Sequence, residues 1–381
     1  MRLSNSDIVE LTDFRRALHR VPEISGEERE TAKAVHAFIA PTKPDRVVTD
    51  LGGHGLAAIY EGTEEGPTIM LRSEIDALPI QEISDNPWVS THPGKAHLCG
   101  HEGHSTILAG VARMLGRERP KRGRVVLMFQ PAEETGAGAA AVISDEKFKA
   151  IAPDYAFSLH NFPGLPLGHA GLSAGPANCA SRGMKIVLSG RTAHSSMPET
   201  GTSPMRAVAE LMPALTALAH GKKLDENFSL VTITHATMGE QAFGIAPGRA
   251  EIWATLRTLR DDRMAALVER AETLARNAAS AAGLGIAIDY HEIFAHCDND
   301  PEAVEILRAA MDAESMPRRE ADPLRASEDF GLFGRGAKSA MFWLGAGENI
   351  PQLHNPDYDF PDALIEPGAR VFMRVVRTML G

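Results

Sequence analysis

The order of strand-like and helix-like segments constrains the fold of this 381-residue chain more than any other feature. Compact apolar runs bounded by Gly or Pro at 68–72 and 124–129 predict buried strands, and the segment 104–115 between them has apolar residues at helical spacing. Alternation of this kind builds a mostly parallel sheet covered by helices. We therefore expect an α/β fold whose main domain contains such a sheet.

The middle of the chain follows a different order. We expect a strand at 183–188, a helix at 203–219, strands at 229–236 and 248–256, a helix at 261–282 and a strand at 286–290. This β-α-β-β-α-β order is typical of the ferredoxin-like split pattern. Because 381 residues also exceed one typical domain, the sequence predicts an inserted ferredoxin-like α+β domain at 180–291 and a discontinuous catalytic domain formed by 1–179 and 292–381.

Sequence signals for helix starts predict where helices begin in the N-terminal part of the chain. A first helix is expected at 7–18. A second is expected to begin at Ser25, because Ser25 can cap a helix and Glu28 lies three residues further on, as in a capping box. The helix expected from 104 places Cys99 and His101 in the loop just before it.

Composition narrows the possible partners and compartments. The net charge of −11 argues against a nucleic-acid partner. No run of about twenty apolar residues is present, and the first residues lack the apolar core of a signal peptide, so we expect a cytoplasmic protein without a membrane partner. The three cysteines, Cys99, Cys179 and Cys297, are too widely spaced for a disulfide framework, which leaves thiols for metal binding or burial.

Residues that can bind metal ions gather in two short segments. Cys99 and His101 stand two residues apart, and the pair Glu133 and Glu134 follows the strand-like run 124–129. A thiolate and an imidazole at this spacing can face one metal from a loop, and the carboxylates can supply a further ligand and a proton acceptor. One Cys-x-His in a chain with fifteen histidines is weak support by itself.

Two further histidines strengthen the case for a metal site. His160 follows the strand-like run 155–158, and His354 lies in a polar loop near the C-terminus. Both stand at the ends of apolar runs, where a rigid scaffold presents functional side chains. Together the segments predict a dinuclear metal centre with its own catalytic base.

Ordered motifs along nearly the whole chain resemble one known family, the dinuclear-metal amidohydrolases that include aminoacylases, hippurate hydrolases and indole-acetyl-amino-acid hydrolases. The resemblance rests on the segments 18–23, 71–80, 99–104, 129–134, 159–161 and 328–330. It implies a catalytic domain with two divalent metal ions per subunit, which could be zinc, manganese, nickel or cobalt. It also implies that the inserted domain is a lid through which a homodimer forms.

The resemblance assigns roles to single residues. The metal ligands that it implies are Cys99, His101, Glu134, His160 and His354, with the Cys99 sulfur shared between the metals. Glu133 would be the general base, because the unligated carboxylate of an adjacent pair can hold the attacking water.

Three residues receive roles beside the metals. Asp76 is expected to hold the second nitrogen of a metal-binding imidazole, although a carboxylate that only caps a strand end would look the same in sequence. His194 is implied as a hydrogen-bond donor to the oxyanion, against the alternative of a surface-turn histidine. Arg257 is implied as the group that binds the substrate carboxylate, against that of a solvated arginine on a strand.

Four positions depart from the family pattern. Glu74 stands where the family generally has Asp, and we assign it no ligand role. Thr192-Ala193 replaces two glycines before the lid histidine, and Gly244 stands where Asn is common. Since a hydrogen-bonding group is missing at Gly244, we expect altered recognition of the substrate.

The sequence therefore predicts a metal-dependent amidohydrolase that hydrolyses small N-acyl amino acids with metal-activated water. One alternative keeps the metal site and changes the substrate, as a dipeptidase or an aminohydrolase of small aromatic amines. An alternative of another class is a non-catalytic, metal-stabilised binding protein. The presence of both Glu133 and Glu134 argues against it, since a binding protein does not need an unligated base.

Overall fold

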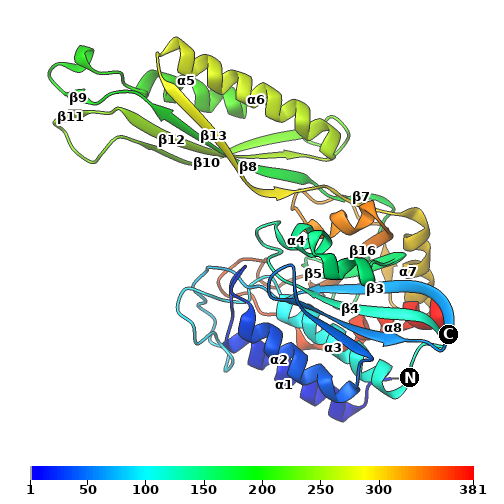
Figure 1. The fold of residues 1–381 in the computed structure, drawn as a ribbon. Coiled ribbons are helices and arrows are strands. Elements are labelled where there is room, and N and C mark those ends of the chain that lie inside the picture. Colours follow the sequence, from blue (N-terminus) through cyan, green and yellow to red (C-terminus); the bar gives the residue numbers. More distant parts are fainter. Residues whose placement is uncertain (1) are drawn as a thin grey trace. The chain divides into compact units, whose positions relative to one another are not determined.

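The chain forms two compact units in this computed structural model, which describes residues 2–381 (Figure 1). The first unit contains the chain up to Ala177 together with Asp298–Asp322 and Asp329–Gly381, and the second contains Asn178–Cys297 and Pro323–Glu328. Each unit has its own cluster of buried apolar side chains. The sequence-based boundaries follow from element order alone, whereas the contacts also assign the short segment Pro323–Glu328 to the second unit.

The first unit is built on an eight-stranded mixed sheet. Its strands lie in the order β1 (Arg46–Leu51), β2 (Gly55–Glu61), β4 (Arg122–Gln130), β3 (Glu64–Glu74), β5 (Tyr155–Pro163), β16 (Lys338–Gly347), β6 (Ala170–Gly171) and β15 (Arg318–Arg319). The four central strands, from β4 to β16, pair in parallel, and β1 and β2 add antiparallel pairs at one edge. The predicted mostly parallel sheet is thus confirmed.

Helices cover both faces of this sheet. Figure 1 shows α1 (Asn5–Arg20), α2 (Arg29–Ile39) and α3 (His101–Arg117) on one face and α4 (Gly138–Ser144) on the other. The remaining elements of this unit are α7 (Pro301–Ala313), α8 (Ile365–Leu380) and the 3-10 turns η1 (Ala40–Thr42), η2 (Glu146–Ala150), η4 (Asp329–Arg335) and η5 (Asp362–Leu364). Within residues 2–381, no helix has both the length and the apolar composition needed to cross a bilayer.

Helical spacing of apolar residues explains how α3 joins the core. Ile107, Leu108, Val111 and Leu115 are fully or almost fully buried and pack in the same cluster as residues of β3, β4 and α8. The helix starts earlier than the sequence predicts, at His101, so this histidine lies in the first turn and not in the preceding loop. The reason is the turn before the helix, whose N-cap residue has a positive φ and is a glycine.

The predicted capping box at Ser25 is wrong. Helix α2 begins at Arg29, and its N-cap residue Glu28 makes no side-chain cap hydrogen bond. Ser25 Oγ donates instead to Asp76 Oδ2 at 2.8 Å, and Glu28 Oε1 accepts from the backbone N–H of Ala132 at 2.9 Å. The two side chains that the local pattern assigns to a capping box therefore form hydrogen bonds with residues that are distant in sequence.

The second unit is an antiparallel sheet with two helices on one face (Figure 1). Its strands lie in the order β10 (Ser229–Met238), β12 (Arg249–Thr258), β8 (Ala180–Ser189) and β13 (Gly285–Phe294), and the helices are α5 (Met205–Thr216) and α6 (Asp261–Ala281). Smaller elements are β9 (Ala193–His194), which pairs with β11 (Ile245–Ala246), and the turn η3 (Pro198–Thr200). The strands β7 (Gly175–Asn178) and β14 (Cys297–Asn299) pair with each other and contain the two positions at which the chain passes from one unit to the other. The core is aliphatic, with Ile186, Leu211 and Ile252 almost completely buried.

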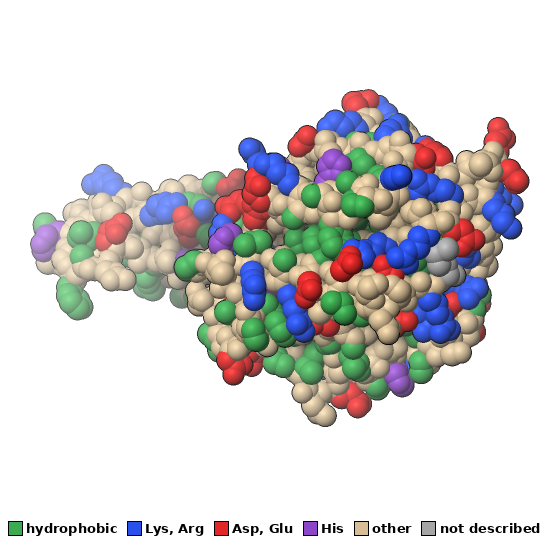
Figure 2. Space-filling view, turned by 90° about the horizontal axis from the view of Figure 1, so that it is seen from below, with side chains coloured by type: hydrophobic (Ala, Val, Ile, Leu, Met, Phe, Trp, Pro, Cys, Tyr) green, Lys and Arg blue, Asp and Glu red, His purple; other side chains and the backbone are tan. Residues whose placement is uncertain are grey.

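Charge is spread over the surface. On the face shown in Figure 2, Lys and Arg side chains are interspersed with Asp and Glu side chains. The chain as a whole carries a net charge of −11.

Candidate metal centre

Cys99 and His101 are set side by side by the turn that opens α3. Gly100 between them has φ 90°, and a Cβ at this position would overlap the side chain of Asn161. Both conditions require glycine. Cys99 Sγ lies 3.4 Å from Nε2 of His160, which comes from the buried strand β5.

The glutamate pair follows the C-terminal end of β4. Glu133 Oε2 and Glu134 Oε1 each lie 3.9 Å from His101 Nε2. Glu134 Oε1 also lies 3.6 Å from Nε2 of His354, whose side chain is 48% exposed. A hydrogen bond from the His354 backbone N–H to the Leu98 carbonyl, 2.8 Å long, holds this late segment beside the Cys99 turn.

The structure thus brings the five predicted ligands into one place. Their donor atoms form overlapping groups in which every pair lies within 4.8 Å. These groups are Cys99, His101 and His160; Cys99, Glu134 and His354; and His101, Glu133 and Glu134. They come from β5, the segment that follows β4, the turn and first residue of α3 and a C-terminal loop, which are far apart in sequence.

The residues fit a pair of metal ions. Among the described residues, His101 Nε2 and Glu134 Oε1 are buried without a hydrogen-bond partner. A buried polar atom left unpaired costs about 1–3 kcal/mol, and a cation between these atoms removes that cost. Thiolate, imidazole and carboxylate together suit zinc and neighbouring divalent transition metals.

The pKa values of Cys99 and His101 also favour a metal site. Burial raises the pKa of the Cys99 thiol well above its usual value, and the charges of Glu134 and Glu133 raise it further. Burial alone would lower the pKa of His101, but its hydrogen bond to Asp76 and the charges of Asp76 and Glu134 raise it to about 9. Without a cation these groups hold protons, and a bound cation takes their place because metal ligands are deprotonated.

Asp76 connects two of the candidate ligands. Its Oδ1 lies 3.2 Å from His101 Nδ1, and its Oδ2 accepts from the backbone N–H of Glu134 at 2.9 Å and from Ser25 Oγ at 2.8 Å. A carboxylate on Nδ1 leaves Nε2 of the imidazole as the metal-facing nitrogen. Asp76 therefore orients a histidine and a glutamate together, which the strand-end position in sequence did not reveal.

A layer of buried polar residues beneath the centre escaped the sequence-based assignment. Glu74 Oε2 lies 2.7 Å from His104 Nδ1, and Glu74 also pairs with Arg72. Arg72 Nη2 in turn donates to Asp329 Oδ1 at 2.6 Å. The signal in sequence was the alternation of Arg72 and Glu74, which places both side chains on one face of a strand.

His194 and Arg257 belong to the second unit. His194 is exposed on β9, where its Nδ1 lies 2.7 Å from Ser196 Oγ. Arg257 on β12 is half-buried, and its Nη1 donates to the Arg325 carbonyl at 2.9 Å and to Ser327 Oγ at 2.8 Å. Burial lowers the pKa of Arg257. The structure describes these two residues within their own unit, and their roles stay predictions.

The departure at Gly244 opens space next to the motif of His194. The Gly244 carbonyl accepts from the Ser195 backbone N–H at 3.0 Å, and Ile245 pairs with His194 across the short sheet. A Cβ at Gly244 would meet no atom within 4 Å among the described residues. A side chain at this position is therefore sterically possible, and the altered substrate recognition expected from its absence stays a prediction.

Comparison with known proteins places the chain among metal-dependent hydrolases. Residues 70–378 match the family model for peptidase family M20/M25/M40. The chain is 31% identical to a hippurate hydrolase of Campylobacter jejuni, with 96% of this chain and 95% of the relative covered. It is 27% identical to an N-acetylcysteine deacetylase of Bacillus subtilis, with 97% of each chain covered.

A solved structure has the same fold. It is that of a Bacillus subtilis protein described as a dinuclear metal-binding peptidase from the M20 family. The TM-score is 0.82 at 26% sequence identity, and 99% of each chain is covered.

Proposed function

The chain belongs to the M20/M25/M40 peptidase family, and from this membership we propose that it is a metal-dependent amidohydrolase that cleaves the amide bond of small N-acyl amino acids. The observation that carries the proposal is the convergence of Cys99, His101, Glu134 and His160, with Glu133 beside them. Two of the converging atoms, His101 Nε2 and Glu134 Oε1, are buried without a hydrogen-bond partner. The names of the full-length relatives, a hippurate hydrolase and an N-acetylcysteine deacetylase, support an N-acyl amino acid as substrate.

We assign two divalent metal ions to this centre. The ligands would be Cys99, His101, Glu134, His160 and His354. The ions, which could be zinc, manganese, cobalt or nickel, would supply Lewis acidity that makes a water molecule a much stronger acid than it is in bulk solvent.

Glu133 is the general base of the proposed reaction. Glu133 is only 6% exposed, and its carboxylate borders the same space as His101 Nε2 and Glu134. Glu133 takes a proton from the attacking water as the oxygen bonds to the carbonyl carbon, and it returns this proton to the leaving nitrogen as the C–N bond breaks. The products are a carboxylic acid and a free amino acid.

Other side chains orient this reaction. Asp76 keeps His101 in the tautomer and direction that metal binding needs. His194 is proposed to donate a hydrogen bond to the carbonyl oxygen as negative charge develops on it. Arg257 is proposed to bind the carboxylate of the amino-acid part through its guanidinium.

The second unit is proposed to be a ferredoxin-like lid and dimerisation domain. Its β-α-β-β-α-β connectivity and the sheet order β10-β12-β8-β13 support the ferredoxin-like assignment. Strand β10 is an edge strand, and an edge can add a strand from another chain. A homodimer through this unit is consistent with that free edge.

The test is a substrate panel with metal-stripped protein and with protein reloaded separately with zinc, manganese, cobalt or nickel. N-acetyl, N-benzoyl and indole-acetyl amino acids are compared with dipeptides and aryl amines, and the free amino acid or amine is measured. We expect metal-dependent release from N-acyl amino acids. Hydrolysis of dipeptides or aryl amines alone would contradict the substrate class, and no hydrolysis with metal bound would support a non-catalytic protein.

A further inference from the structure

Six buried polar side chains form one connected network beneath the metal centre, and we call it the Glu74 network. In order of contact, its members are Tyr358, Asn161, His104, Glu74, Arg72 and Asp329. None of them is more than 1% exposed. A fully paired network in a buried place holds its members in fixed positions, because every displaced partner leaves a polar group unsatisfied.

The imidazole of His104 is the central link. Its Nε2 accepts from the backbone N–H of Asn161 at 3.1 Å, so its Nδ1 carries the proton and donates to Glu74 Oε2 at 2.7 Å. The donor atoms of Glu74 and His104 also lie close enough to His101 to hold a metal ion. Since both ring nitrogens of His104 already have partners, we assign neither Glu74 nor His104 as a ligand.

Asn161 connects the network to one side of the metal centre. Its backbone carbonyl accepts from His160 Nδ1 at 2.8 Å, which leaves Nε2 of that ring facing Cys99 Sγ. Its side-chain Nδ2 donates to Tyr358 Oη at 2.6 Å. Because a Cβ on Gly100 would overlap the Asn161 side chain, this residue also packs against the turn after Cys99.

Arg72 connects the network to the other side. Its Nε donates to Gln130 Oε1 at 3.0 Å, and its Nη2 donates to Asp329 Oδ1 at 2.6 Å. Asp329 Oδ2 in turn accepts from the backbone N–H of Ala139 at 2.8 Å. Gln130 ends β4 and Ala139 lies in the first turn of α4, so these bonds fix both ends of the segment that carries the glutamate pair.

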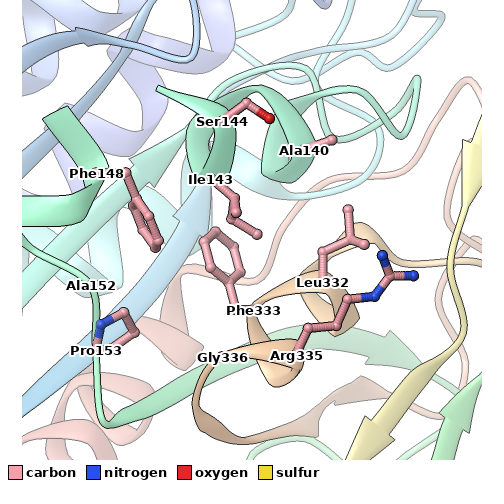
Figure 3. A pocket seen from close by; sticks show the side chains of 10 residues that line it. All are labelled: Ala140, Ile143, Ser144, Phe148, Ala152, Pro153, Leu332, Phe333, Arg335 and Gly336. Atoms are coloured by element: carbon pink, nitrogen blue, oxygen red, sulfur yellow. The ribbon is translucent and has the colours of Figure 1, made fainter. Parts of the chain in front are cut away.

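The elements that Asp329 joins also have apolar contacts of their own. Figure 3 shows Ile143 of α4 close to Phe333 of η4, at a mostly apolar cavity of about 380 Å³. None of the six side chains of the Glu74 network lines this cavity. A change in the network therefore leaves the apolar packing of α4 and η4 in place.

We propose that Glu74 is a positioning residue that couples the two sides of the metal centre. Its Oε2 pairs with His104 and so with the side that carries His160, and its Oε1 pairs with Arg72 and so with the segment 131–138. A shift of this one carboxylate displaces ligands on both sides. The inference rests on the proposed function, because it concerns the metal ions that the proposed function assigns to this site.

The test uses cobalt(II) as the probe, bound to protein that has been stripped of metal and reloaded. The visible absorption of bound cobalt depends on the number and geometry of its ligands, whereas a loss of stability alone leaves it unchanged. Glu74→Gln keeps the size of the side chain and removes its charge, and Glu74→Asp keeps the charge and withdraws it by one methylene group. We expect both variants to shift the cobalt spectrum and to bind cobalt about 10- to 100-fold more weakly.

Turnover gives a second readout of the same variants. With cobalt at saturation, kcat for an N-acyl amino acid should fall in Glu74→Gln and Glu74→Asp. KM should stay nearly constant, because the contacts with the substrate are untouched.

Tyr358→Phe tests the far end of the network without removing a charge. The variant keeps the aromatic ring and loses the hydrogen bond with Asn161. We expect the cobalt spectrum to shift less than in the Glu74 variants. Because this change leaves no buried charge unpaired, the variant decides the question even if Glu74→Gln does not fold.

Asp7→Asn is the matched control for the loss of a buried carboxylate. Asp7 is 2% exposed and accepts from Arg117 at 2.6 Å and from Arg113 at 3.1 Å, and neither arginine belongs to the Glu74 network. The variant should lower the free energy of unfolding and leave the cobalt spectrum and affinity unchanged. A spectral shift as large as that of Glu74→Gln would overturn the proposal.

Two further outcomes would overturn the positioning role. One is an unchanged cobalt spectrum and affinity in folded Glu74→Asp and Tyr358→Phe. The other is the loss of one of two bound cobalt ions at saturation, because Glu74 would then be a ligand. Unchanged protein that binds cobalt and hydrolyses no amide would contradict the proposed function alone, since spectrum and affinity are measured without turnover.

Discussion

The two units bury different kinds of side chain. The first unit buries charged and ionisable groups completely, among them Arg15, Arg72, Asp76 and His101. In the second unit the sheet and its helices bury mainly aliphatic residues, and the functional candidate His194 is exposed. A buried charge is costly unless it is paired or binds an ion, so the first unit carries polar groups that packing alone does not explain.

Within the first unit, one group of buried charges is paired internally. His19 Nδ1 lies 2.8 Å from Glu102 Oε1, and Arg15 Nη1 donates to Asp359 at 2.6 Å. Glu102 is the neighbour of His101, so one turn of α3 contacts both this ion-pair network and the metal centre. The comparison teaches that the first unit buries two groups of polar side chains. One forms the candidate metal centre, and the other is an ion-pair network that stabilises the helices next to it.

The largest effect is expected for Glu133→Gln. Removal of the general base should lower kcat by about 10²- to 10⁴-fold and leave the metal content unchanged, because Glu133 is not assigned as a ligand. Metal content and turnover are measured on the same samples. Glu134→Gln should lose metal, and Glu30→Gln, an exposed site on α2, should change neither. Full activity of Glu133→Gln would show that this buried carboxylate of the first unit has no part in the chemistry.

A packing change in the second unit tests whether its stability depends on the buried aliphatic side chains. Ile252 is fully buried in β12, and Ile252→Ala should lower the free energy of unfolding by about 2–5 kcal/mol because it leaves a cavity. Chemical denaturation measures this change. Ile293→Ala is the matched control, since Ile293 is 48% exposed and its loss should cost less than about 0.5 kcal/mol. Loss of metal from folded Ile252→Ala would show that metal binding in the first unit depends on the packing of the second, contrary to the comparison above.

A smaller effect is expected for Asp76→Asn. The amide keeps the size of the side chain but weakens its hold on His101 Nδ1, so metal affinity should fall by about 10- to 100-fold. Competition with a chelator measures the affinity. Asp13→Asn, an exposed position on α1, serves as the control. Unchanged metal affinity in Asp76→Asn would assign this carboxylate a structural role only.

The smallest effect is a pH dependence that arises at His19. Burial alone would lower its pKa, but Glu102 and Glu82 raise it from 6.5 to about 9. The stabilisation that His19 provides is therefore complete below pH 6.5 and is lost as the pH rises through about 9. Between pH 7 and 8 the stability difference between the unchanged protein and His19→Gln should shrink by about 1 kcal/mol.

Denaturation at the two pH values measures this difference. The control is His36→Gln, at a partly exposed position on α2. A stability difference that does not vary with pH would mean that His19 is neutral in the fold and that the ion-pair network does not hold α1 as described.

Much of the fold could be predicted from local patterns. The strands predicted at 68–72 and 124–129 lie within β3 and β4, and the helix predicted at 261–282 corresponds closely to α6. The family resemblance drawn from the motifs is confirmed by the match over residues 70–378. Where the pattern failed, at Ser25, the side chain had a stronger partner from another part of the chain, and a local rule cannot include such a partner.

The sequence by itself determined the element order and the family, and it named the candidate metal donors, because periodicity and short motifs act over neighbouring residues. Only the tertiary structure decided which donor atoms meet, that Asp76 contacts both His101 and Glu134, and that Glu74 faces His104. It also decided that a mostly apolar cavity lies between α4, η2 and η4. These contacts join segments that are distant in sequence, and their geometry follows from how the sheet and its helices pack.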